Sequence, residues 1–81
     1  MPPAAEEELR AFVTAVREIR ARQRLTQETV AAIGGVGRKY VGQLERGELV
    51  PSFPAVVAIA RGLGVPLSEL IRVYEERLAR R

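Results

Sequence analysis

Side chains suited to specific hydrogen bonding gather near the middle of the chain, in residues 25–47. Four of them are spaced to lie on one exposed side of a short helix: Arg38, Lys39, Tyr40 and Gln43. Arginine and lysine can donate to both acceptors of a guanine, and a glutamine amide can pair with an adenine. A short helix that carries such side chains near its start has the chemistry and the shape to enter a DNA major groove.

The remaining residue types argue against catalysis. The chain contains no cysteine, no histidine and no aspartate, so thiolate zinc sites, histidine-based acid–base catalysis and Ser-His-Asp triads are excluded. Only glutamate or lysine could act as the catalytic group of an enzyme, and no arrangement of these residues in the sequence indicates an active site. We therefore expect a non-enzymatic binding protein with no metal, no other cofactor and no small-molecule substrate.

Length and charge indicate one basic domain. The 81 residues suit a single domain, residues 1–81, with a modest core. The net charge is only +3, but residues 17–46 carry seven basic and three acidic side chains. Such a basic patch is the electrostatic footprint of nucleic-acid binding, although an ordinary solvated surface would show the same charges.

Neither a signal peptide nor a membrane span is indicated. The N-terminal segment is acidic at residues 6–8, unlike a signal peptide. No apolar run is long enough to cross a bilayer. We therefore expect a cytoplasmic protein without a membrane partner.

Apolar periodicity predicts helices throughout, and no stretch alternates as a strand would. Apolar residues at three- and four-residue spacing, with capping residues, glycines and prolines at the ends, divide the chain into helices of about 4–22, 27–33, 38–45, 53–63 and 66–79. The short connections between them favour a compact all-α domain.

The second and third helices carry the residues that a helix-turn-helix requires. Thr26 is a candidate N-cap, and Gly35 can adopt the positive φ that the turn needs. A small residue, Ala31, suits the point where the two helices touch. Apolar residues face inward at Val30, Val36, Val41 and Leu44. All of these features together within residues 26–46 indicate the motif more strongly than any one of them alone.

In this window and around it, the chain resembles the Xre/Cro-type helix-turn-helix domains of bacterial and phage repressors. The resemblance covers a core of residues 16–71, with the helix-turn-helix at 26–46. It rests on R-x-x-R from Arg17, L-T-Q from Leu25, V-A from Val30, G-V from Gly35, L-E-R-G from Leu44, P-S from Pro51 and A-x-x-L-G-V from Ala60. It implies a compact five-helix lambda-repressor-like DNA-binding domain, here with extended first and last helices.

The resemblance also implies roles for individual side chains. Contacts to base edges are implied for Arg38, Lys39 and Gln43. Contacts to phosphate or sugar, which set register rather than specify sequence, are implied for Gln27, Tyr40 and Arg46. The candidate DNA-binding set is completed at the starts of the two helices by Thr26 and Gly37. An ordinary role competes with each assignment: solvation for the cations, packing on the second helix for the tyrosine, and support of the helix start for Gln27.

A buried ion pair is implied between Arg20, on the apolar stripe of the first helix, and Glu45, on the inner side of the third. A structural role outweighs a DNA-contacting one for both residues. Removing one partner would leave a charge unpaired and cost about 3–5 kcal/mol.

Several positions depart from the family pattern. Gly34 stands where leucine or valine is usual, so we expect a gap that Ile33 fills. Gly37 replaces a capping serine or threonine, and Gly42 weakens the recognition helix by about 1 kcal/mol relative to alanine. Either a soft recognition helix or a close approach to the DNA backbone follows from these glycines. The loop that starts at Glu48 is acidic where many relatives are basic, so we expect weaker phosphate contact.

The long first and last helices carry apolar residues that a minimal domain does not need: Leu9, Phe12, Val13, Tyr74 and Leu78. These residues can extend the core, form a homodimer interface, or do both. The sequence leaves the two roles open.

Together these features predict a sequence-specific double-stranded-DNA-binding transcriptional regulator, a repressor, that binds a palindromic operator as a homodimer. Two alternatives stay open. One is an antitoxin that binds both DNA and a toxin partner, which a neighbouring toxin gene would favour. The other is a protein-interaction module, which would show no salt-dependent DNA binding.

Overall fold

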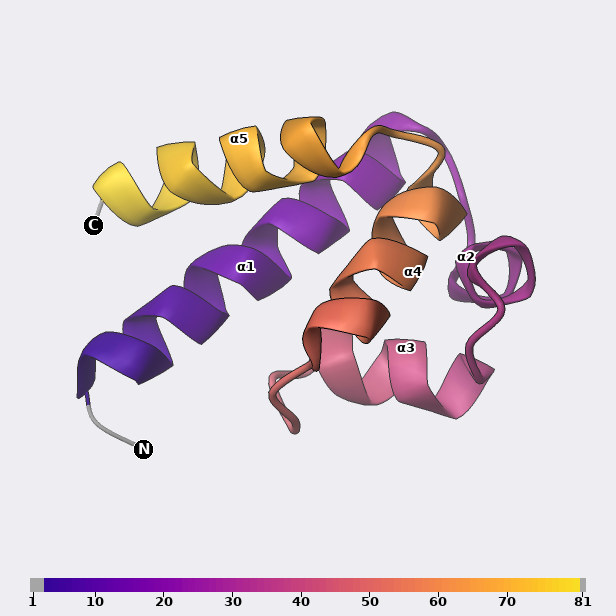
Figure 1. Ribbon diagram of the computed structural model, residues 1–81, viewed down its shortest axis with the longest axis horizontal. Helices are drawn as coiled ribbons and strands as arrows, with labels where there is room; N and C mark the ends of the chain where they lie inside the picture. Colours follow the sequence, from indigo (N-terminus) through magenta and orange to yellow (C-terminus); the bar gives the residue numbers. More distant parts are fainter. Residues whose placement is uncertain (1–2, 81) are drawn as a thin grey trace.

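The computed structural model describes residues 3–80 and contains five α-helices (Figure 1). They are α1 (Pro3–Arg22), α2 (Gln27–Gly34), α3 (Arg38–Glu45), α4 (Phe53–Leu63) and α5 (Leu67–Ala79). No strand occurs within this range. The predicted all-α fold is confirmed, and each helix begins and ends within one residue of its predicted limits. The predicted domain of residues 1–81 also includes Met1, Pro2 and Arg81, which lie outside the described residues.

Local chemistry sets the helix ends much as the sequence indicates. Thr26 precedes α2, and its side-chain oxygen accepts a hydrogen bond from the backbone N–H of Thr29 at 3.0 Å. Gly35 follows α2 with a φ of 76°, a left-handed conformation that favours glycine. Ser52 caps α4 in the same way as Thr26 caps α2. By contrast, the N-cap of α3 is Gly37, which has no side chain to accept such a bond.

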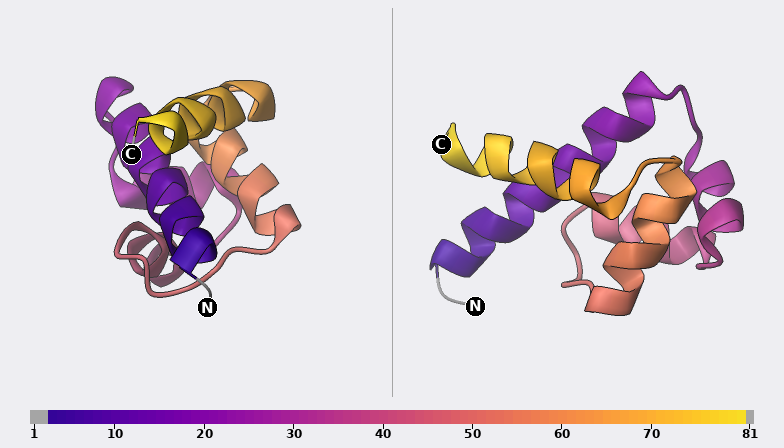
Figure 2. Two further views of the ribbon diagram at one scale, coloured as in Figure 1. Left: turned by 90° about the vertical axis from the view of Figure 1, so that its left-hand side faces the viewer. Right: turned by 45° about the horizontal axis from the view of Figure 1, so that its top comes forward.

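The core is formed where α1 packs along α5 and α2 packs on α4 (Figure 2). Rings from the two end helices meet there, since Phe12 and Tyr74 make an edge-on contact with centroids 6.3 Å apart. Phe12 and Val13 are each only 8% exposed. These two side chains therefore belong to the chain's own core, which is one of the two roles that the sequence left open.

The expected gap at Gly34 does not exist. A Cβ placed on Gly34 would lie 2.6 Å from the carbonyl oxygen of Ala58, and one on Gly62 would lie 2.3 Å from that of Val30. The backbones of α2 and α4 therefore touch, because both helices have glycine where they cross. Ile33 does not fill any space there, since it is 53% exposed. The prediction of a cavity was wrong because it assumed the helix spacing of relatives with larger side chains.

Across residues 3–80, no single helix is both long enough and apolar enough to cross a membrane. α1 is the longest, with 20 residues, and it carries charged side chains along its length. α4 and α5 meet the length and composition requirement only as a pair, with a bend of 102° between them.

Candidate nucleic-acid interface

The third helix has one sealed side and one open side. Its apolar residues Val41 and Leu44 have no exposed surface and pack in the core. Val36, in the turn before it, packs against the same core. Arg38 and Lys39 are exposed at its start. α3 is thus held by its apolar side and presents its polar side at one edge of the molecule (Figure 1).

Three side chains of α3 are predicted to reach bases, Arg38, Lys39 and Gln43, and Tyr40 is predicted to reach the DNA backbone; all four are at least partly exposed. Arg38 and Lys39 are exposed, whereas Tyr40 and Gln43 are half-buried. None of the four makes a side-chain hydrogen bond or an ion pair with any residue in the described part of the chain. Their donors and acceptors are therefore available to an external partner.

A buried ion pair connects α1 to α3, as the resemblance implied. Nε of Arg20 donates to Oε2 of Glu45 at 2.7 Å, and Nη2 donates to Oε1 at 3.0 Å. Nη1 of the same guanidinium donates to the carbonyl oxygen of Leu25 at 2.9 Å, just before α2 begins. The Glu45 side chain is 4% exposed and the Arg20 side chain 24%. One arginine therefore fixes the relative positions of three helices.

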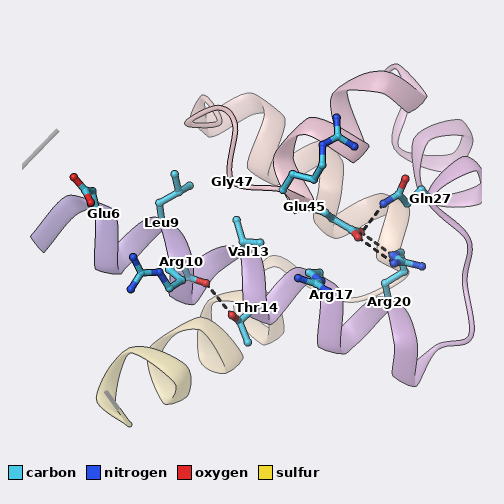
Figure 3. A pocket seen from close by; sticks show the side chains of 11 residues that line it. Glu6, Leu9, Arg10, Val13, Thr14, Arg17, Arg20, Gln27, Glu45 and Gly47 are labelled. Carbon is cyan, nitrogen blue, oxygen red and sulfur yellow. Dashed lines mark hydrogen bonds and ion pairs between the residues drawn. The ribbon is translucent and has the colours of Figure 1, made fainter. Parts of the chain in front are cut away.

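Gln27 belongs to the same network, which sequence analysis did not foresee. Its amide Nε2 donates to Oε1 of Glu45 at 3.1 Å, so the carboxylate binds both Arg20 and Gln27 (Figure 3). Gln27 and Glu45 are 18 positions apart, and no periodic pattern in the sequence relates them. Gln27 still stands at the start of α2, where the first backbone N–H groups of a helix have no partner within it and attract anions.

Arg46, predicted to touch the DNA backbone, has a carboxylate partner on its own loop. Its Nε donates to Oε2 of Glu48 at 2.8 Å. This hydrogen bond lowers the pKa of the Glu48 carboxyl below its ordinary value and raises that of Arg46. The sequence shows that the loop is acidic at Glu48. The two-residue spacing between Arg46 and Glu48 was the signal that could have indicated this ion pair.

An open cleft of about 840 Å³ lies between α1 and the end of α3 (Figure 3). Arg10 and Arg17 contribute to its α1 side, and Arg46 and Gly47 to its α3 side. Sequence analysis identified Arg17 in a family motif and did not consider Arg10 as a site residue. The cleft therefore extends the positive surface from the helix-turn-helix onto the long first helix.

Known proteins with this architecture include repressors and controller proteins. The cryptic phage CTXphi transcriptional repressor RstR of Vibrio cholerae is 35% identical over 67 residues, which are 83% of this chain. The chain spans 60% of RstR's length. The restriction-modification controller protein C.AhdI of Aeromonas hydrophila is 37% identical, with a TM-score of 0.71 over 76% of this chain and 94% of C.AhdI. The controller C.Esp1396I shares the fold, with a TM-score of 0.86 at 20% identity over 91% of this chain and 96% of its own.

Family membership follows from a match to the family as a whole. Residues 16–70, which include α2, α3, α4 and the second part of α1, match the helix-turn-helix family HTH_3. This match confirms the resemblance to Xre/Cro-type domains on nearly the same residues, 16–71. The chain belongs to the helix-turn-helix family of DNA-binding transcriptional regulators.

Proposed function

We propose that this chain is a transcriptional repressor that binds specific sequences in double-stranded DNA. In this proposal it acts in the cytoplasm and has no enzymatic activity. The open side of α3 carries the proposal. Arg38, Lys39 and Gln43 have no side-chain hydrogen bond or ion pair within residues 3–80, and their chemistry suits guanine and adenine edges. The inner side of α3 is fixed by the core and by Glu45, so these side chains are presented on a rigid support.

The residues around α3 suit the DNA backbone. Gln27 and Thr26 stand at the start of α2, and Gly37 at the start of α3, where unpaired N–H groups favour a phosphate. Tyr40 and Arg46 flank the recognition surface on the same helix and its C-cap. In this arrangement phosphate contacts fix the register of α3, and base contacts select the sequence.

A homodimer completes the proposal. An apolar groove of about 420 Å³ includes Leu9, Ile71 and Tyr74 in its wall. Val50 and Phe53 line the same groove and are 64% and 69% exposed. We propose that a second copy of the chain covers this surface, which includes three of the candidate interface residues, Leu9, Phe12 and Tyr74. Two recognition helices would then enter successive major grooves of a palindromic operator, about one helical turn apart.

Selection from random-sequence DNA followed by gel-shift measurement tests the function. We expect a palindromic sequence to be enriched and its binding to weaken steeply with salt. Enrichment of no sequence would refute sequence-specific repression. The absence of any salt-dependent binding would favour a protein-interaction module instead.

Light scattering of a Phe53→Glu variant tests the assembly. A charge at this exposed position cannot be buried against a second copy, so we expect a monomer with weaker operator binding. Ile33→Glu is the matched control, because Ile33 is also exposed but does not line the groove. A Phe53→Glu variant that stays dimeric would refute this interface.

A controller of a restriction-modification system is a second candidate, favoured by the 37% identity to C.AhdI. Restriction endonuclease and methyltransferase genes beside this gene would support it. A toxin gene in the same place would support the antitoxin alternative instead.

A further inference from the structure

Arg46, at the C-cap of α3, is bound along one edge by Glu48. Its Nε donates to Oε2 at 2.8 Å, and its Nη2 donates to Oε1 at 3.2 Å. Two parallel bonds of this kind are also the means by which arginine grips a phosphate. The Arg46 and Glu48 side chains are 60% and 49% exposed, so the pair adds little to the stability of the fold.

The other end of the guanidinium lies against α3 at Gly42. A Cβ built on Gly42 would be 3.2 Å from Nη1 of Arg46 and 3.5 Å from Oε1 of Gln27. The guanidinium therefore uses space that a side chain would restrict, close to the start of α2.

We propose that Glu48 occupies the place of a DNA phosphate on Arg46 in the free protein and competes with DNA for it. The inference rests on the proposed function, because it concerns the same DNA-binding surface. A phosphate that takes the Nε–Nη2 edge must first displace the Glu48 carboxylate from Arg46, and breaking that ion pair lowers the net affinity. Glu48 lowers the affinity for all sequences alike, because a phosphate contact carries no sequence information.

A carboxylate beside an arginine can instead assist binding by holding the guanidinium in position. Competition fits this geometry better, since Glu48 takes the Nε–Nη2 edge while Gly42 lies beside Nη1. The two roles predict opposite changes in affinity when Glu48 loses its charge.

Glu48→Gln tests the sign, because glutamine keeps the shape and removes the charge. Fluorescence anisotropy over a series of KCl concentrations measures binding to the duplex selected by the wild-type protein and to a random-sequence duplex of the same length. We expect both affinities to rise about five- to tenfold at low salt. The slope of log affinity against log salt concentration should steepen by about one. Unchanged or weaker binding by this variant overturns the inference.

Arg46→Ala separates competition from a general charge effect. Under competition, Glu48→Gln should change the affinity little once Arg46 is absent, whereas an equal gain with and without Arg46 overturns the inference. Glu76→Gln is the matched control, because Glu76 forms a comparable exposed ion pair on α5, and it should leave the affinity unchanged. Thermal melting verifies that every variant is folded.

The wild-type measurement keeps the two proposals distinguishable. A wild-type protein that binds neither duplex overturns the proposed function and this inference together. A wild-type protein that binds its selected duplex, with a Glu48→Gln variant that binds no more tightly, overturns the inference alone.

Discussion

Replacing Gly62 with alanine should destabilise the domain, because α4 and α2 cross there in backbone contact. The new Cβ would lie 2.3 Å from the carbonyl oxygen of Val30, whereas ordinary contact begins at 3.4 Å. The difference of 1.1 Å must be met by moving a helix, since the obstructing atom belongs to the backbone. Overpacking of this kind costs up to about 3 kcal/mol. The better helix propensity of alanine offsets about 1 kcal/mol of this cost, so the free energy of unfolding should fall by about 2 kcal/mol.

Urea and thermal unfolding followed by circular dichroism measure this loss. For a domain of this size, about 2 kcal/mol corresponds to a fall of about 8–16 °C in Tm. Total stability of about 4–12 kcal/mol leaves the variant folded at room temperature. Gly42→Ala is the matched control, because its nearest obstruction is the flexible end of Arg46, and it should raise Tm. A Gly62→Ala variant that melts at or above the wild-type temperature would refute the reasoning about close helix contact.

Three further predictions follow from individual side chains. Arg38→Ala should relax specificity at one base position by about 1–3 kcal/mol, measured with operator variants; uniform weakening would identify a phosphate contact instead. Glu45→Ala should cost about 3 kcal/mol in urea unfolding, because the partly buried Arg20 loses its partner; a loss below about 1 kcal/mol would contradict this. The Arg77 guanidinium lowers the pKa of the Glu18 carboxyl, so the stability advantage of wild type over Glu18→Gln should be full at pH 7. This advantage should decrease as the pH falls below 4.5, the ordinary pKa of a glutamate, because the Glu18 carboxylate is then protonated. Tm values of the two proteins that do not approach each other at low pH would contradict the prediction.

Local features of the fold could be predicted from the sequence. Thr26 and Ser52 cap helices through bonds to residues only three positions away, and Gly35 follows from the φ that its turn requires. Such signals act over a few residues, so they need no knowledge of the tertiary structure. The apolar pattern also located the sealed side of α3 correctly, at Val41 and Leu44.

Contacts between distant segments could not be predicted in this way. The backbone contact at Gly34 depends on a second glycine in α4, and the bond between Gln27 and Glu45 spans 18 positions. Phe53 is apolar and yet 69% exposed, which helical spacing alone does not reveal, because exposure depends on what the rest of the chain covers. The candidate DNA-contacting residues were recognised by family position, and their roles toward DNA stay predictions.

The division of α3 into a sealed side and an open side has an evolutionary consequence. Exchanges at Arg38, Lys39 or Gln43 remove no side-chain hydrogen bond or ion pair within residues 3–80, so under the proposed function a lineage can acquire a new target site without compensating changes in its core. The inward residues Val41 and Leu44 have no such freedom, since any change in their volume is felt by the packed interior. Under the proposed function, target choice and foldability therefore depend on separate positions of one eight-residue helix.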